Sequence, residues 1–90
     1  MSLDLNYAVF TTSYVIEKMS AIVYVVHDKD GDWQFFGNEK DVDEQNGRVV
    51  SLGEIIKIDR TIEEILWIPL STEARRDKIG AEWTTAFYSQ

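Results

Sequence analysis

The step Asp30-Gly31 constrains the fold of this chain more than any other local feature. It lies between two runs rich in β-branched and aromatic residues, 21–28 and 33–37. A tight primed turn needs positive φ, which glycine adopts at little cost, so the pattern predicts a β-hairpin with a two-residue turn. In that register, the hairpin face that we expect to pack on helices carries Ile22, Tyr24, Val26, Trp33 and Phe35.

Two short helices are predicted in the second half of the chain, each from a capping pattern. Residues 51–54 read Ser-Leu-Gly-Glu and match the S-x-x-E capping box, which predicts a helix over 52–58. Residues 61–64 repeat the pattern and predict a second helix over 62–67. This helix ends before Pro69, because the residue that precedes a proline is driven out of the α region.

The other segments complete the prediction of a small α+β domain. Residues 7–16 favour an extended conformation that breaks near Thr12, and 83–88 favour a strand on propensity. Residues 73–77 are charged and fit either a helical turn or an edge strand. We therefore expect one domain over residues 1–90, with a small antiparallel sheet around the hairpin and the two helices packed on one face.

The charge balance excludes several classes of partner. The chain has 16 acidic and 9 basic residues, a net charge of −7, which argues against binding nucleic acid or an anionic membrane surface. Cysteine is absent, so neither a disulfide nor a thiolate site is available. We see no signal peptide and no apolar run long enough to span a bilayer, which predicts a cytoplasmic, bacterial protein. The sequence contains no nucleotide-binding loop and no H-E-x-x-H metal motif, so no cofactor is predicted.

An acidic tract from Asp28 to Glu44 holds seven carboxylates and two lysines. Such a tract is typical of a solvated loop, but a partner-steering surface and a cation site are the alternatives. A calcium loop starting at Asp28 needs glycine at its sixth position, where Trp33 stands, so no metal ligand is predicted. The candidate residues for binding a partner are Asp28, Asp30, Asp32, Trp33, Glu39 and Asp41.

Three further side chains or sets of side chains have both a structural and a functional interpretation. His27 is the only histidine, but no nucleophile stands at a supporting spacing, so we expect a structural hydrogen bond rather than catalysis. Trp33 and Trp83 are expected to be half-buried and Trp67 to cap the core, although tryptophan also anchors interfaces. The doublet Arg75-Arg76 suits a carboxylate, and the nearest ones lie in the acidic tract or at the helix ends.

Several strings occur in a fixed order along the chain: His27-Asp28-x-Asp30-Gly31-Asp32-Trp33-Gln34-Phe35, Val49 to Ile55, Asp59, Ile68-Pro69, Ala74-x-Arg76 and Trp83. This pattern resembles a family of small bacterial proteins with a domain of unknown function, related to immunity proteins of toxin systems. The chain departs from the pattern at 60–61 and at 71–72, which puts the loop after Pro69 in question. The resemblance implies a compact α+β domain that is bacterial, intracellular and not an enzyme, and it supplies no site residue.

These observations favour a non-catalytic module that binds a basic protein, as an immunity-like inhibitor of a basic toxin does. The alternative in a different class is a small catalytic or cation-dependent domain centred on the hairpin from His27 to Asp32. A third hypothesis is a structural homo-oligomer, for example a homodimer, that uses the less apolar sheet face or the tail strand as its interface.

Overall fold

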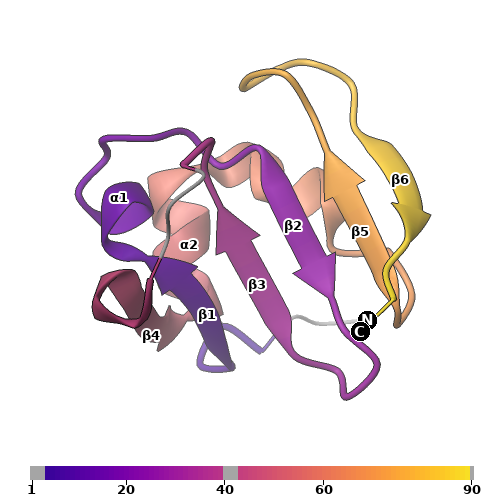
Figure 1. The fold of residues 1–90 in the computed structure, drawn as a ribbon, viewed down its shortest axis with the longest axis horizontal. Coiled ribbons are helices and arrows are strands. Elements are labelled where there is room, and N and C mark those ends of the chain that lie inside the picture. The colour runs from indigo at the N-terminus through magenta and orange to yellow at the C-terminus, as the bar shows by residue number, and fades with distance from the viewer. Residues whose placement is uncertain (1–3, 40–42, 90) are drawn as a thin grey trace.

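The computed structural model describes residues 4–39 and 43–89, and this part of the chain forms one β-sheet with short helices on one face (Figure 1). Its strands are β1 (Ala8–Thr12), β2 (Tyr24–His27), β3 (Trp33–Phe36), β4 (Gly47–Ser51), β5 (Thr72–Arg75) and β6 (Thr84–Phe87). Its helices are α1 (Ser13–Ile16), α2 (Leu52–Ile58) and the 3-10 segments η1 (Glu44–Asn46) and η2 (Arg60–Ile65). The predicted α+β class is confirmed.

The sheet is mixed, with the spatial order β4-β1-β3-β2-β5-β6. Every neighbouring pair is antiparallel except β1 and β3, which run parallel. The prediction of an antiparallel sheet was therefore wrong for this one pair. The parallel pair arises because β3 is inserted between β1 and β2, which run in opposite directions. Only Phe10 and Gln34 are in register across it, and the buried Thr11 hydroxyl adds a 2.8 Å hydrogen bond to the Phe35 carbonyl.

The hairpin of β2 and β3 forms where it was predicted, but with a different turn. The amide of Gly31 donates to the carbonyl of Asp28 at 3.1 Å, and Gly31 has φ of +91°. The loop therefore holds three residues, a type I turn followed by a left-handed glycine, rather than the two residues expected. This shifts the register by one position, so that Val25 lies opposite Phe35 and His27 opposite Trp33.

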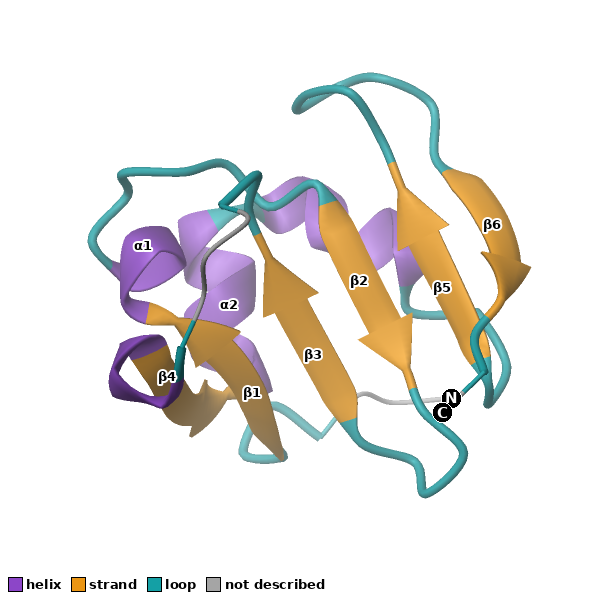
Figure 2. Cartoon of the chain, viewed as in Figure 1, coloured by secondary structure: helices purple, strands orange, loops and turns teal. Residues whose placement is uncertain are grey.

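The shifted register exchanges part of the two sheet faces. Val25 and Phe35 point into the core with the helices, whereas Tyr24 and Val26, which were expected there, point to the opposite face. Because side chains alternate along a strand, one extra residue in the turn is sufficient for this exchange. Figure 2 shows α2 and the helical segment that follows it behind the sheet and, in the described part of the chain, no helix in front of β2, β3 and β5; we call this front side the open face.

The helices begin at side-chain caps, one as predicted and one not. The Ser51 hydroxyl accepts from the Glu54 amide at 3.1 Å, and α2 has the predicted bounds. The second element is a 3-10 helix that begins earlier than expected, because Asp59 rather than Thr61 is its cap and accepts from the Thr61 amide at 2.9 Å. Both elements bury isoleucine and leucine side chains against the sheet: Leu52, Ile55, Ile62 and Ile65.

A buried ion pair fastens the helix junction to the sheet. Nη2 of Arg76 lies 2.6 Å from Oδ2 of Asp59, and the two side chains are 0% and 6% exposed. The same guanidinium donates to the Ile22 carbonyl through Nε and Nη2 and to the Thr61 hydroxyl through Nη1. The Trp83 ring lies over it, with its centroid 4.2 Å from Cζ. The expected carboxylate partner of the arginine doublet is therefore a helix end.

The last two strands resolve the ambiguous tail. Residues 72–75 form an internal strand, β5, and 84–87 form β6, which is one edge of the sheet. In the described part of the chain no helix has the length and hydrophobicity needed to cross a membrane.

Candidate functional site

The groups at the tip of the β2–β3 hairpin are engaged within the turn. Oδ1 of Asp28 accepts from the amides of Asp30 and Asp32 at 2.9 and 3.0 Å, and Oδ2 faces the Gln34 amide nitrogen at 3.4 Å. Asp28 is only 5% exposed, so its carboxylate holds the turn together rather than facing a ligand. Asp30 and Asp32 are exposed at the tip. No group of three or more metal-ligating side chains occurs among the described residues.

His27 has a structural position. Its Nδ1 lies 2.9 Å from the Ile68 carbonyl, so the ring donates a hydrogen bond that ties β2 to the segment after η2. The ring stacks on Trp33 at 3.9 Å between centroids and 10° between planes. Trp33 is partly buried and packs against the core. This arrangement agrees with the expectation of a structural hydrogen bond.

The six candidate residues do not gather at one surface. Asp28, Asp30, Asp32 and Trp33 lie at or beside the hairpin turn, while Glu39 lies beyond the opposite end of β3. Asp41 lies outside the described residues. The acidic tract is therefore divided by β3, and Glu39 alone of the set lines the pocket described next.

A row of aromatic and cationic side chains crosses the open face. The Phe10 and Phe36 rings are 6.1 Å apart, and the Phe36 and Tyr24 rings are stacked at 5.9 Å. The guanidinium of Arg75 continues the row, with Cζ 3.9 Å from the centroid of the Tyr24 ring. This row joins four strands and depends on the observed register, because Tyr24 lies opposite both Phe36 and Arg75.

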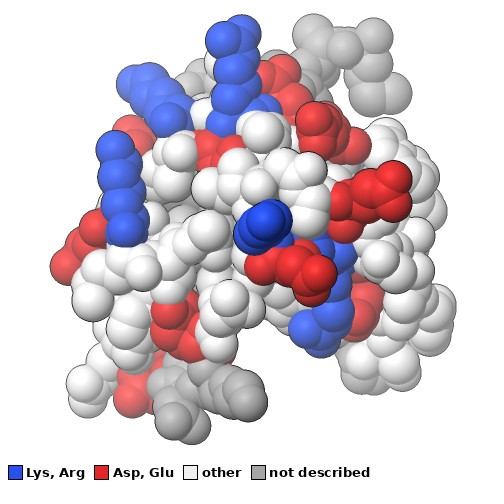
Figure 3. Space-filling view, turned by 90° about the horizontal axis from the view of Figure 1, so that it is seen from above, with Lys and Arg blue, Asp and Glu red and all other residues white. Residues whose placement is uncertain are grey.

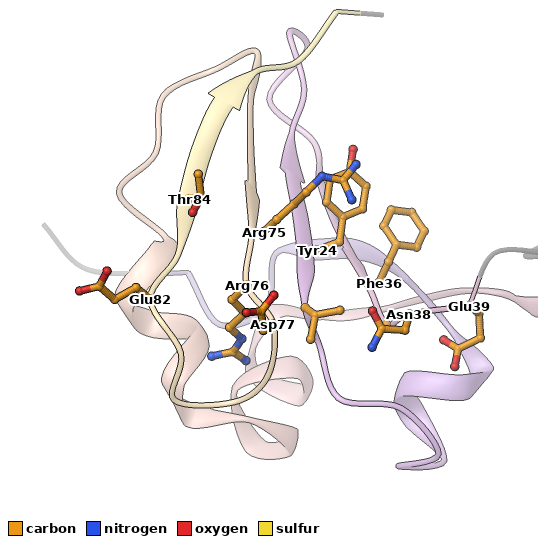
Figure 4. Close-up of a pocket in the computed structure, with 11 residues that line it drawn as sticks. Tyr24, Phe36, Asn38, Glu39, Arg75, Arg76, Asp77, Glu82 and Thr84 are labelled. Atoms are coloured by element: carbon orange, nitrogen blue, oxygen red, sulfur yellow. The ribbon is translucent and has the colours of Figure 1, made fainter.

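One end of the row opens into a shallow cavity of about 630 Å³ between the end of β3 and the β5–β6 connection (Figure 4). We call it the carboxylate pocket. Tyr24 and Phe36 form its apolar part, and Glu39 and Asp77 lie on either side of them. The remaining lining residues are Val23, Gly37, Asn38, Arg75, Arg76, Glu82 and Thr84.

Glu39 carries the most informative atom of this pocket. The Ser20 hydroxyl donates to its Oε2, whereas its Oε1 is buried and has no hydrogen-bond partner among the described residues. Gly37 allows this arrangement, because a Cβ there would lie 2.5 Å from Cβ of Ser20 and 2.7 Å from Oε1. A buried acceptor without a donor is costly. A ligand that donates to Oε1 gains a strong contact once the Glu39 side chain turns to expose this atom to the pocket.

The charges at this end of the molecule must be sorted pair by pair, because acidic and basic side chains are interspersed on the face seen from above (Figure 3). The charge of Arg76 is compensated by Asp59, and that of Arg75 by Glu73 at 3.2 Å. Asp77 makes no ion pair with a described residue, and the carboxylate of Glu82 points away from the pocket. The uncompensated charge of the pocket is therefore negative.

Burial and Glu73 change the acidity of Tyr24. Desolvation raises the pKa of its phenol above 10.0, and the negative charge of Glu73 raises it further, with a smaller opposing effect of Arg75. The phenol therefore stays protonated throughout the neutral range. It donates to Oε1 of Glu73 at 3.2 Å, which holds the ring in place on the open face.

Sequence analysis missed most of this pocket. Tyr24 was assigned to the helix-covered face, because the expected turn was one residue shorter than the observed one, and Phe36 was given no role. A local signal for the longer turn is present: aspartate is favoured at the first position of a type I turn and glycine at the fourth, as in Asp28 and Gly31. No local signal places Asp77 beside Phe36.

Comparisons with known proteins add no further assignment. No protein-family model matches the chain, and neither the curated proteins nor the solved structures give a match. The resemblance to the immunity-related family therefore stays a prediction.

Proposed function

We propose that this protein is a non-catalytic binding module that takes a lysine or arginine side chain of a basic protein partner into the carboxylate pocket. The observation that carries the proposal is the buried Oε1 of Glu39, which has no hydrogen-bond partner among residues 4–39 and 43–89 and lies in the same pocket as the Tyr24–Phe36 pair. An ammonium or guanidinium group supplies the missing donor and the opposite charge together. An immunity-like inhibitor of a basic toxin is one form of this function.

The aromatic pair favours a cation over a neutral donor. A cation within about 6 Å of an aromatic face gains roughly 0.5–2 kcal/mol from the ring. Arg75 already lies over Tyr24 in this manner, which leaves the neighbouring Phe36 ring as the apolar wall for an incoming side chain. The net charge of −7 adds long-range attraction for a basic partner.

Catalysis and cation binding at the hairpin receive less support from the geometry. The imidazole of His27 and the carboxylate of Asp28 are both engaged in contacts that hold the fold. Asp30 and Asp32 are exposed at the turn and do not converge with a third ligand among the described residues.

The test is a titration followed by amide NMR shifts, with the blocked tripeptide Gly-Lys-Gly as probe and blocked Gly-Gln-Gly as the neutral control. We expect saturable shifts for residues 36–39 and 75–77 with the lysine peptide only. Glu39→Gln keeps an acceptor for Ser20 but removes the charge, and it should weaken binding about tenfold or more, as the loss of a charge-assisted hydrogen bond does. Asp77→Asn should weaken binding to a smaller extent.

The matched control is Asp30→Asn/Asp32→Asn, which removes two acidic charges at the other end of β3. This variant should bind the lysine peptide within about twofold of the wild type, because exposed, distant charges are screened. Equal weakening by both variants would mean that the peptide senses only net charge. That outcome, or an equal response to the neutral peptide, would refute the pocket as the site.

A further inference from the structure

The β6 edge of the sheet carries a second exposed surface, which is independent of the carboxylate pocket. Trp67, Leu70 and Phe87 are 69%, 52% and 76% exposed. With Pro69, they border one hollow of about 460 Å³, whose other lining residues are Ser71, Thr72, Thr85 and Ala86. We call these residues the edge patch. Trp67 was expected to cap the core, and its exposure here corrects that expectation.

The edge patch is uncharged in a chain of net charge −7. None of its eight residues is acidic or basic. A basic partner attracted by the acidic charge gains no ion pair at this patch. A second copy of the chain, in contrast, presents the same apolar residues. Two edge patches can therefore meet without bringing acidic side chains of the patches together.

No strand of the described residues pairs with the outer side of β6. The Tyr88 amide donates to the Ser71 carbonyl of the β5 side at 2.8 Å, and backbone groups alternate in direction along a strand. The amides and carbonyls of Thr85 and Phe87 therefore point outward from the sheet. All four residues of β6 are exposed, and none is a charged residue or a proline that would discourage pairing.

The opposite edge of the sheet differs in this respect. β4 carries the charged Arg48 at its second position, and the Arg48 guanidinium donates to the Gln45 and Gly47 carbonyls at 2.8 and 2.7 Å. Charged side chains on an edge strand are a common protection against strand addition. One edge is thus protected, and the other combines free backbone groups with exposed apolar side chains.

From these observations we propose that two copies of the chain associate through antiparallel β6–β6 pairing, with the two-fold axis at Ala86. Thr85 of one copy then lies opposite Phe87 of the other, and their outward backbone groups form the hydrogen bonds. The small Ala86 side chain meets its own copy at a non-hydrogen-bonded position, where two Cα atoms are about 4.5 Å apart. The interface is self-complementary, as a two-fold contact requires.

The absence of cysteine permits a direct test of this register by cross-linking. Ala86→Cys should form an intermolecular disulfide readily on mild oxidation, because the Cα separation lies within the range that disulfides need. The matched control is Thr84→Cys, on the same strand and also exposed. Its two copies would be offset by four positions, about 13 Å along the strand, and should cross-link much more slowly.

Sedimentation equilibrium of the unmodified chain, from micromolar to millimolar concentration, gives the second readout. We expect a mass of twice 10.4 kDa at the upper end. Phe87→Glu should return the protein to a monomer, whereas Val49→Glu at the opposite edge, where Val49 is 71% exposed, should leave the dimer intact. Circular dichroism confirms that each variant is folded.

Three outcomes would overturn the proposal. They are a monomer throughout the concentration range, a dimer that Val49→Glu disrupts and Phe87→Glu does not, and equal cross-linking of the Ala86→Cys and Thr84→Cys variants. The first outcome would indicate that the edge patch binds an extended segment of another protein instead of a second copy of the chain.

Discussion

Breaking the buried pair of Arg76 and Asp59 should be among the most destabilising single changes to this fold, and Arg76→Met is the substitution that tests it. Methionine keeps much of the side-chain volume but removes the four hydrogen bonds that the guanidinium donates to Asp59, Ile22 and Thr61. The carboxylate of Asp59, 6% exposed, then stays in the interior without its counterion.

The expected loss follows from that burial. Removal of one partner from a buried ion pair costs about 3–5 kcal/mol, because the other charge is left uncompensated. A chain of 90 residues has a total free energy of unfolding of roughly 5–13 kcal/mol. Arg76→Met should therefore remove between a quarter and nearly all of the stability. Asp59→Asn should cost a similar amount even though an asparagine still caps η2.

Urea unfolding followed by tryptophan fluorescence measures these losses, and Trp83 lies directly over the guanidinium. The matched control is Arg75→Met. The neighbouring Arg75 pairs with Glu73, and the two side chains are 63% and 20% exposed, so its loss should cost at most about 1 kcal/mol. The double variant Asp59→Asn/Arg76→Met should be more stable than the sum of the single losses predicts, by about 2 kcal/mol or more. Additive losses, or an Arg76→Met loss no larger than that of Arg75→Met, would refute the reasoning.

Three further predictions concern the open face, its pocket and the hairpin. The folded state raises the pKa of Tyr24 above the unfolded value of 10.0, so its contribution to stability is complete below pH 10 and is lost as pH rises toward the folded pKa. Urea unfolding of the wild type and of Tyr24→Phe measures this contribution. Above pH 10, the free energy of unfolding of the wild type should fall relative to that of the variant. A difference that does not change with pH would contradict the raised pKa of Tyr24. Gly37→Ala should destabilise the fold by about 1–3 kcal/mol through overpacking, because the new Cβ would lie 2.5 Å from Ser20 Cβ and 3.2 Å from the Ala21 carbonyl oxygen. An unchanged urea midpoint would contradict this prediction and show that Ser20 moves freely. Millimolar calcium or magnesium should leave the Tm unchanged, because the hairpin aspartate that is buried already accepts hydrogen bonds within its turn; a clear rise in Tm would support a cation site.

The acidic tract contains residues of the pocket, but the aspartates that make it conspicuous in the sequence lie elsewhere. Asp28 was a candidate for binding a partner, yet its carboxylate accepts hydrogen bonds from backbone amides of its own turn. Glu39, beyond β3 in the same tract, has a carboxylate oxygen without a partner in the described part of the chain, and its neighbour in space is Ser20. The tract is continuous in sequence, but β3 separates its two ends.

The sequence by itself determined the features that depend on residues close to one another in the chain. These include the hairpin between the two β-prone runs, the cap at Ser51 with the bounds of α2, and the α+β class. Caps, turns and strand propensities act over a few residues, where the backbone conformation is set by local hydrogen bonds and sterics.

Only the tertiary structure decided the partners of these elements and which surfaces they leave exposed. The insertion of β3 beside β1, the pairing of Arg76 with Asp59 across 17 residues, and the exposure of Trp67 all depend on long-range packing. One residue more in the turn moved Tyr24 and Val26 to the open face, because side chains alternate along a strand. The carboxylate pocket and the edge patch are consequences of that packing, because each combines residues that are far apart in the sequence.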